Sequence, residues 1–193
     1  MLSSTDIYIV TGALTSDRDG WTLRDIADLL HVDHTLVHRA LRRAGAAGLY
    51  MSSTRRVNRP NFEELVTHAV RFIAPVQLGE LTRGVPAAWS VDPISTIIHQ
   101  QAHEHPPVWP HALGAMRGQT LEPLHPAAIE VSRANPVLGV LLSIIDSLRA
   151  GDMRVRQVAA NLLHVVLAEG ASPQAALSRT YNSSSAAFSS STD

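Results

Sequence analysis

Two short amphipathic segments joined by a tight turn constrain the fold of this chain more than any other feature. They cover residues 22–30 and 34–44, and only His31-Val32-Asp33 separates them. In each segment the apolar residues recur at the spacing of one helical face, which predicts two short helices that pack against each other. These apolar positions are Leu23, Ile26, Ala27 and Leu30 in the first segment, and Leu36, Val37, Ala40, Leu41 and Ala44 in the second.

The ends of both segments carry helix-capping residues. Thr22 with Asp25 has the spacing of a capping box, in which a hydroxyl and a carboxylate satisfy the free amides of the first turn. Asp33 is placed to cap the second helix. The turn position usually held by glycine is His31, which would need a left-handed conformation at a cost of about 1 kcal/mol.

Charge is distributed unevenly along the chain. Residues 34–62 contain six arginines and no acidic residue, so the other ten arginines and seventeen acidic residues leave the remainder with a formal charge of −7. This asymmetry favours an anionic partner for one segment only. Every basic residue is arginine, which GC-rich coding would explain; a guanidinium also suits bidentate contact with phosphate and guanine.

A basic hairpin is predicted directly after the helix pair. Leu49-Tyr50-Met51 has the composition of a strand, Ser52-Ser53-Thr54 of a turn, and Arg55-Arg56-Val57 of the returning strand. With a further helix predicted over 5–14, residues 5–75 resemble the winged helix-turn-helix transcriptional regulators, with the MarR-like group the nearest. The resemblance implies a sequence-specific regulator that binds double-stranded DNA, with the second helix in the major groove.

The resemblance also implies which side chains would contact DNA. The exposed face of the second helix would reach base edges and then phosphates, while the hairpin would enter the flanking minor groove. The hydroxyl and amide of Thr22, at a helix N-terminus, could contact phosphate. The complete predicted set is Thr22, His34, Thr35, His38, Arg39, Arg42, Arg43, Arg55, Arg56 and Arg59.

The amino-acid composition changes after the hairpin. Asn61 with Glu64 predicts the start of a connecting helix that ends at Pro75. Between 75 and 126 lie eight of the eleven prolines, which predicts ordered but largely irregular chain with a helix near 93–101. The arginine-glycine steps Arg83-Gly84 and Arg117-Gly118 are expected at turns.

The last third of the chain returns to a helical pattern. Asn135-Pro136 predicts the start of an apolar helix over 137–148, and a second helix follows over 155–167. Such an apolar hairpin needs covering by the proline-rich segment or by another subunit. A short helix is predicted over 173–181. The expected fold is mainly α: a winged helix-turn-helix domain over 1–75, a helical domain over 76–181, and a disordered tail over 182–193.

Two roles are open for the C-terminal part. It could support a homodimer and bind an effector, because helix-turn-helix proteins usually bind two half-sites as symmetric dimers. Alternatively, it could bind and neutralise a partner protein, as in antitoxins with a similar layout. The winged helix would then regulate its own operon.

Enzymatic chemistry is not predicted. We find no pairing of nucleophile and base, no phosphate-binding glycine loop and no cysteine, and we expect no cofactor. The run His99, His103, His105 and His111 could hold Zn²⁺, but prolines interrupt it and no metal is expected. Trp89 and Trp109 fit core anchors better than a ligand pocket.

No signal peptide or long apolar run is present, so we expect a cytoplasmic protein without membrane association.

Overall fold

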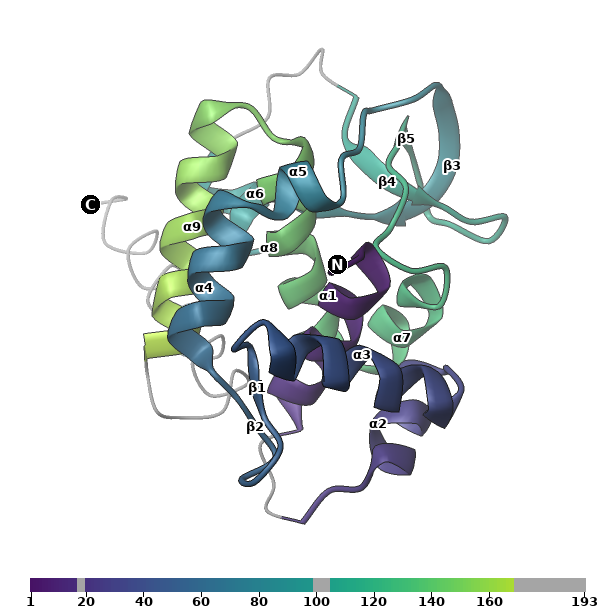
Figure 1. Cartoon of the computed structure of the whole chain (residues 1–193). Helices are drawn as coiled ribbons and strands as arrows, with labels where there is room; N and C mark the ends of the chain where they lie inside the picture. Colours follow the sequence, from purple (N-terminus) through teal and green to yellow (C-terminus); the bar gives the residue numbers. More distant parts are fainter. Residues whose placement is uncertain (17–19, 99–104, 169–193) are drawn as a thin grey trace, which may run out of the picture.

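The computed structural model of the chain describes residues 1–16, 20–98 and 105–168. The fold is mainly helical, with a two-stranded hairpin at one end and a three-stranded sheet at the other (Figure 1). The predicted fold class is therefore confirmed at the level of a mainly α protein with a small hairpin. In the part of the chain that the structure describes, every helix falls short of the length and apolarity needed to cross a bilayer.

Two helices form the centre of the molecule. Helix α1 (Ser4–Thr15) is buried from Asp6 to Leu14, and α8 (Pro136–Ala150) is buried along almost its whole length. The two helices contact each other, and one hydrophobic cluster runs from Ile7 to Leu167. The apolar face of α8 is therefore covered within the chain, by α1, α7, α9 and η1 among others. The predicted boundary between 75 and 76 stays a prediction.

The helix pair forms as the sequence predicts. Helix α2 (Leu23–Leu30) begins after the Thr22–Asp25 capping box, and α3 (His34–Ala46) begins after Asp33. His31 adopts the expected left-handed conformation, with φ 52° and ψ 47°. The buried hydroxyl of Tyr8 in α1 donates a 2.9 Å hydrogen bond to the carbonyl oxygen of Leu30, which fixes the end of α2 on the core.

The predicted hairpin is also present, although its strands are shorter than expected. Strands β1 (Tyr50–Met51) and β2 (Arg56–Val57) pair antiparallel, with Tyr50 opposite Val57. Residues 52–55 form the turn, in which Arg55 has a positive φ of 53°. A left-handed arginine is uncommon, and such positions gather at functional sites.

The connecting helix begins earlier than predicted. Asn58, and not Asn61, is the N-cap of α4 (Arg59–His68), because Pro60 fits the first turn and the Asn58 side chain accepts from the Asn61 amide. The Asn61 side chain instead donates to the carbonyl oxygen of Gly48 at 2.9 Å. The helix also breaks at Ala69 before the short helix α5 (Val70–Ile73).

The prediction that the proline-rich segment is largely irregular is wrong. Strands β3 (Leu81–Pro86), β4 (Pro107–Pro110) and β5 (Met116–Thr120) close into a small barrel in which β3 pairs antiparallel with both other strands. Prolines occupy the ends of β3 and β4, where a missing amide donor costs least. The segment also contains η1 (Ala88–Ser90) and α6 (Ile94–Ile98), and α6 confirms the described part of the helix predicted near 93–101.

The two arginine-glycine steps lie within strands and not at turns. In the β3–β5 pair, Arg83 is directly opposite Arg117. The glycines are needed for close approach across the barrel: a Cβ on Gly84 would lie 2.3 Å from the Trp109 carbonyl oxygen, and one on Gly118 would lie 2.0 Å from that of Pro106. A turn would have used the conformational freedom of these glycines, whereas the barrel uses their small size.

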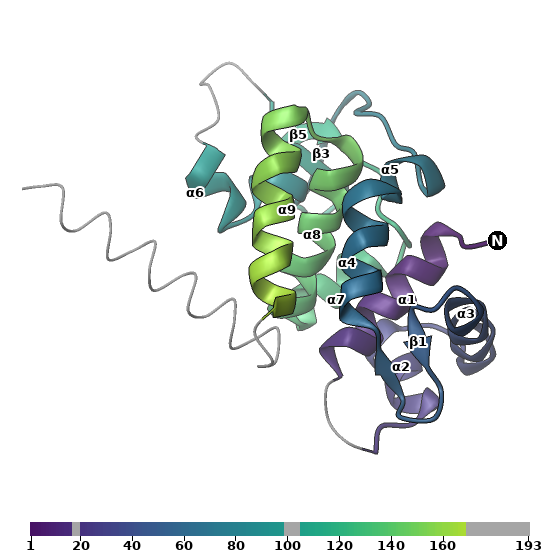
Figure 2. The same ribbon diagram turned by 60° about the vertical axis from the view of Figure 1, so that its left-hand side comes forward.

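The C-terminal helices follow the predicted pattern. After α7 (Ala128–Ala134), Asn135 caps α8 by accepting from the Leu138 amide at 3.1 Å, and Pro136 occupies the first turn. Helix α9 (Met153–Ala168) then packs beside α8 and α4, as Figure 2 shows. The helix predicted over 173–181 and the tail over 182–193 lie outside the described residues.

Candidate nucleic-acid interface

Helix α3 separates an apolar inner face from a polar outer face. Its inner face is formed by the buried residues Val37, Ala40, Leu41 and Ala44, which hold it against the core. Its outer face is formed by His34, Thr35, His38, Arg39 and Arg42, which are all exposed. The apolar side therefore fixes the helix so that five of the predicted contact residues lie at the surface.

A groove brings predicted residues from three elements together. It has a volume of about 650 Å³ and lies between the start of α2, the middle of α3 and the hairpin. Thr22, His38, Arg42 and Arg55 all line it. A donor at a helix N-terminus, an imidazole and two guanidiniums thus converge on one concave surface. Such a set of hydrogen-bond donors fits phosphate oxygens.

The capping residues have limited freedom at this surface. The Thr22 amide donates to the Asp25 carboxylate at 2.6 Å, so the Thr22 hydroxyl is the group left to donate to a phosphate. Hydrogen bonds from the backbone and side chain of Thr22 lower the pKa of Asp25. The Thr35 hydroxyl likewise donates to Asp33, so Thr35 has its methyl group and oxygen lone pairs to offer to a base.

Arg43 forms an ion pair with a buried carboxylate of the protein. Its guanidinium forms a two-pronged contact with Asp6 of α1, with Nη2 at 2.6 Å and Nε at 3.0 Å from carboxylate oxygens. The hydrogen bond to Asp6 raises the pKa of Arg43. The structure therefore places Arg43 as a tie between α3 and α1.

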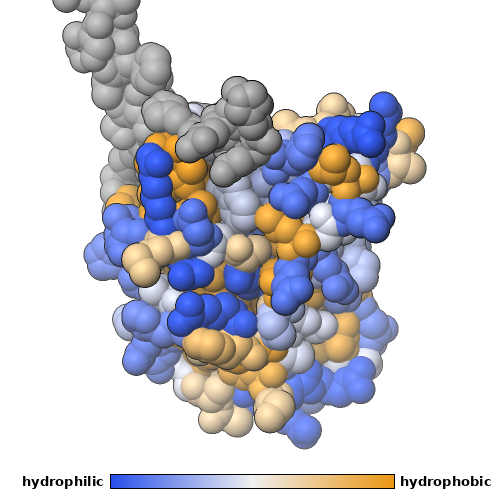
Figure 3. All heavy atoms as spheres, turned by 90° about the horizontal axis from the view of Figure 1, so that it is seen from above, coloured by the Kyte–Doolittle hydropathy of each residue, from blue (hydrophilic) through white to orange (hydrophobic). Residues whose placement is uncertain are grey.

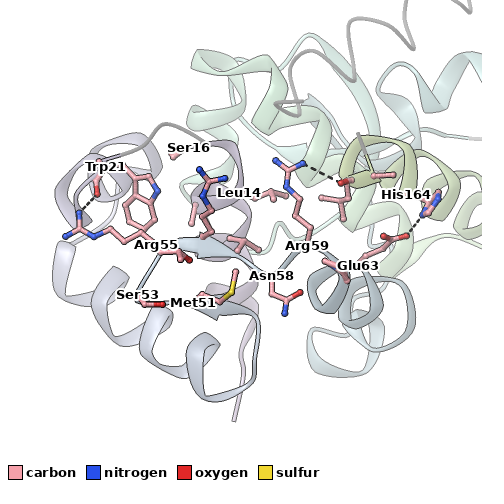
Figure 4. A pocket seen from close by; sticks show the side chains of 18 residues that line it. Leu14, Ser16, Trp21, Met51, Ser53, Arg55, Asn58, Arg59, Glu63 and His164 are labelled. Carbon is pink, nitrogen blue, oxygen red and sulfur yellow. Dashed lines mark hydrogen bonds and ion pairs between the residues drawn. The ribbon is translucent and has the colours of Figure 1, made fainter. Parts of the chain in front are cut away.

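The arginines of the hairpin and of α4 lie around a second hollow. This hollow, about 920 Å³ in volume, lies between the hairpin, the start of α4 and the end of α9 (Figure 4). Arg55 donates to the Trp21 carbonyl oxygen at 2.8 Å, and Arg59 donates to that of Leu167 at 3.4 Å. Arg56 also lines the hollow. The predicted set is thus divided between two neighbouring surfaces on either side of the hairpin.

Sequence reasoning missed some residues of the groove. Ser52 and Ser53 at the hairpin turn line it, together with Tyr50. Their hydroxyls add donors at the place where Arg55 enters. The sequence places both serines in the predicted turn between the two strands. Serine is common in turns because its hydroxyl bonds to the nearby backbone, so its presence there did not suggest a contact with DNA.

The other candidate chemistry does not gather into a site in the described residues. His99 and His103 lie outside them, and His111 pairs with Glu130 at 2.9 Å. Over residues 1–16, 20–98 and 105–168, no cluster of three or more His, Asp or Glu side chains could hold a metal ion. Trp109 is a core anchor: it is buried, and its Nε1 donates to Asp146 at 2.7 Å.

Comparison with known proteins adds no relative to this picture. Neither a protein-family model, nor a curated protein, nor a solved structure matches the chain. Function must therefore be inferred from the geometry of the groove and of α3.

Proposed function

We propose that this protein is a DNA-binding transcriptional regulator of the winged helix-turn-helix type. In this proposal α3 lies in the major groove of double-stranded DNA, and the hairpin is the wing on the flanking groove. The protein would act as a homodimer on two half-sites, because helix-turn-helix proteins usually read symmetric operators.

One observation carries the proposal: the groove in which Thr22, His38, Arg42 and Arg55 converge from three elements. It adjoins the exposed outer face of α3, and residues 34–62 around it contain no acidic side chain. A patch that combines several arginines with a rigid, exposed helix face is what DNA recognition needs. An ordinary solvated helix face has no reason to align with a basic hairpin in this way.

The proposal is tested by removing the two arginines on the outer face of α3. Duplexes would first be selected from a random-sequence pool with the parent protein, and their affinity measured by fluorescence anisotropy at moderate salt. We expect R39A/R42A to weaken binding by about tenfold or more for each arginine that hydrogen-bonds to a base edge, without changing the far-UV spectrum. The matched control R133A/R154A removes exposed arginines of α7 and α9 and should bind like the parent.

The wing is tested separately through salt dependence. Each arginine that meets a phosphate releases counterions, so R55A/R56A should flatten the slope of log K against log salt by about 1–2. An unchanged slope would remove the hairpin from the interface. Parent-like affinity of R39A/R42A, or failure of the parent to select any duplex, would refute the proposed function itself.

A further inference from the structure

The barrel at the opposite end of the molecule carries a second pair of arginines that the DNA proposal does not use. Arg83 of β3 and Arg117 of β5 are directly opposite each other in the antiparallel pair, and both are exposed. Side chains in that relation have Cβ atoms about 4.5–5.5 Å apart on the same face of the sheet. Two guanidiniums are thus held side by side at the surface.

Neither guanidinium is neutralised by a residue that the structure describes. Among those residues, no hydrogen bond or ion pair involves the side chain of Arg83 or Arg117. The acidic residues nearest along the two strands, Glu80 and Glu122, form no ion pair with them. Like charges directly opposite each other destabilise a strand pair. The fold therefore tolerates a repulsion that an external carboxylate would relieve.

Apolar side chains border the arginine pair. Leu81, two residues before Arg83 on the same face, is 41% exposed. Leu81, Arg83, Met116 and Arg117 also line a shallow hollow of about 470 Å³. Figure 3, which looks down on this end of the molecule, shows hydrophobic residues interspersed among hydrophilic ones.

The combination of two arginines with apolar side chains favours one kind of binding partner over others. A phosphate backbone would pair with the arginines but would not contact the apolar side chains of Leu81 and Met116 favourably. An added β-strand has nowhere to pair, because the barrel is closed. An acidic segment with apolar side chains satisfies both features, and arginine is enriched among the residues that dominate protein–protein binding.

We propose that Arg83 and Arg117, with Leu81 and Met116 beside them, form a docking surface for an acidic, apolar segment of a partner protein. The surface is at the other end of the molecule from α3, so a docked partner leaves α3 accessible (Figure 1). This arrangement fits the second role raised from the sequence, in which the C-terminal part holds a protein while the N-terminal part binds DNA.

The test uses peptide display with counter-selection. Random peptides are selected on the full-length parent protein after depletion on R83E/R117E, and the enriched peptides are then synthesised with a fluorescent label. We expect them to combine Glu or Asp with Leu-like residues. Their anisotropy-measured affinity should fall about tenfold or more on R83E/R117E. The matched control R133E/R154E should bind like the parent.

A charge swap makes the test specific. Changing the acidic residues of an enriched peptide to lysine should abolish binding to the parent and restore it to R83E/R117E. Enriched peptides without acidic residues, or equal affinity for the parent and R83E/R117E, would overturn the proposal. So would a loss of duplex DNA binding in R83E/R117E as large as in R39A/R42A, because the pair would then be a nucleic-acid contact. R39A/R42A should leave peptide binding unchanged, which separates this proposal from the proposed function.

Discussion

The N-terminal and C-terminal halves of the chain each contain a buried aspartate paired with an arginine, and the two pairs differ in their surroundings. Asp6, 0% exposed, pairs with Arg43, which is 38% exposed. Asp146, 1% exposed, pairs with Arg149, which is only 4% exposed. The first pair thus reaches solvent through its arginine, whereas the second is enclosed. A pair open to water keeps part of its solvation, but an enclosed one depends entirely on its protein partners.

The enclosed pair connects three parts of the C-terminal half. Asp146 accepts from Trp109 of β4 and from Arg149, while Arg149 also donates to the carbonyl oxygens of Ala74 and Glu122. Burial raises the pKa of Asp146, against the opposing influence of Arg149 and Trp109. The pair therefore anchors the barrel and the end of α5 to α8.

The largest expected effect comes from breaking the enclosed pair. D146N keeps an acceptor for the Trp109 indole but leaves the buried charge of Arg149 uncompensated, so we expect a loss of about 3–5 kcal/mol in the free energy of unfolding. Urea denaturation followed by circular dichroism measures it. E64Q, a substitution on the exposed side of α4, should not change stability. A loss below about 1 kcal/mol would contradict the comparison, because Arg149 would then not depend on Asp146.

Breaking the open pair should cost less. In R43M the Asp6 carboxylate still accepts from the amide and hydroxyl of Ser3, at 2.9 and 3.0 Å, so we expect a loss of about 1–3 kcal/mol. R42M, one residue away and exposed, should leave stability unchanged but weaken DNA binding. If R43M instead keeps full stability and loses DNA affinity, Arg43 contacts phosphate and is not a tie between α3 and α1.

A smaller effect is expected at Tyr8, which contacts both α2 and the segment before α7. Tyr8 donates to Leu30 of α2 and stacks on His125, which precedes α7, at a centroid distance of 4.9 Å. Y8F removes one buried hydrogen bond, so unfolding should become easier by about 1 kcal/mol. Y50F is the matched control, since the Tyr50 hydroxyl has no hydrogen bond to a described residue. Equal stability of the two variants would show that the Tyr8 hydroxyl does not hold the end of α2.

The smallest effect concerns pH. Hydrogen bonds from Thr22 lower the pKa of Asp25, and those from Thr35 lower the pKa of Asp33. These carboxylates stabilise the fold above their unfolded pKa, and that contribution is lost as pH falls through the folded pKa.

Carboxyl NMR titration measures these aspartate pKa values. Asp25 and Asp33 should titrate below the ordinary aspartate range. T35V removes the strongest hydrogen bond to Asp33, so the pKa of Asp33 should rise while that of Asp25 stays in place. An unchanged Asp33 titration would show that the Thr35 hydroxyl does not donate to it.

The sequence predicted those features that depend on nearby residues. The caps at Thr22 and Asp33, the left-handed His31, and the start of α8 at Asn135-Pro136 are settled within a few positions of the chain. The predicted start of α4 was wrong because Asn58 and Asn61 are both suitable N-cap residues and lie only three positions apart. The exposed face of α3 was predicted because the helical period separates apolar from polar positions.

Features that depend on distant residues were out of reach. Arg43 looks like its neighbours Arg39 and Arg42 in the sequence, and only the fold reveals Asp6, 37 positions earlier, as its partner. The barrel was missed because its strands are short and its prolines signal irregular chain. Gly84 and Gly118 looked like turn residues because nothing local shows that other strands pass within 3 Å of their missing side chains.

The contact between α1 and α8 has a consequence for the energetics of binding. Because both helices belong to one hydrophobic cluster, opening α8 to solvent also disturbs the support of α3. A duplex that binds only the folded protein at α3 stabilises every element that must unfold together with α3, and α8 is one of them. Amide hydrogens of α8, which the duplex never touches, should then exchange with solvent more slowly in the complex.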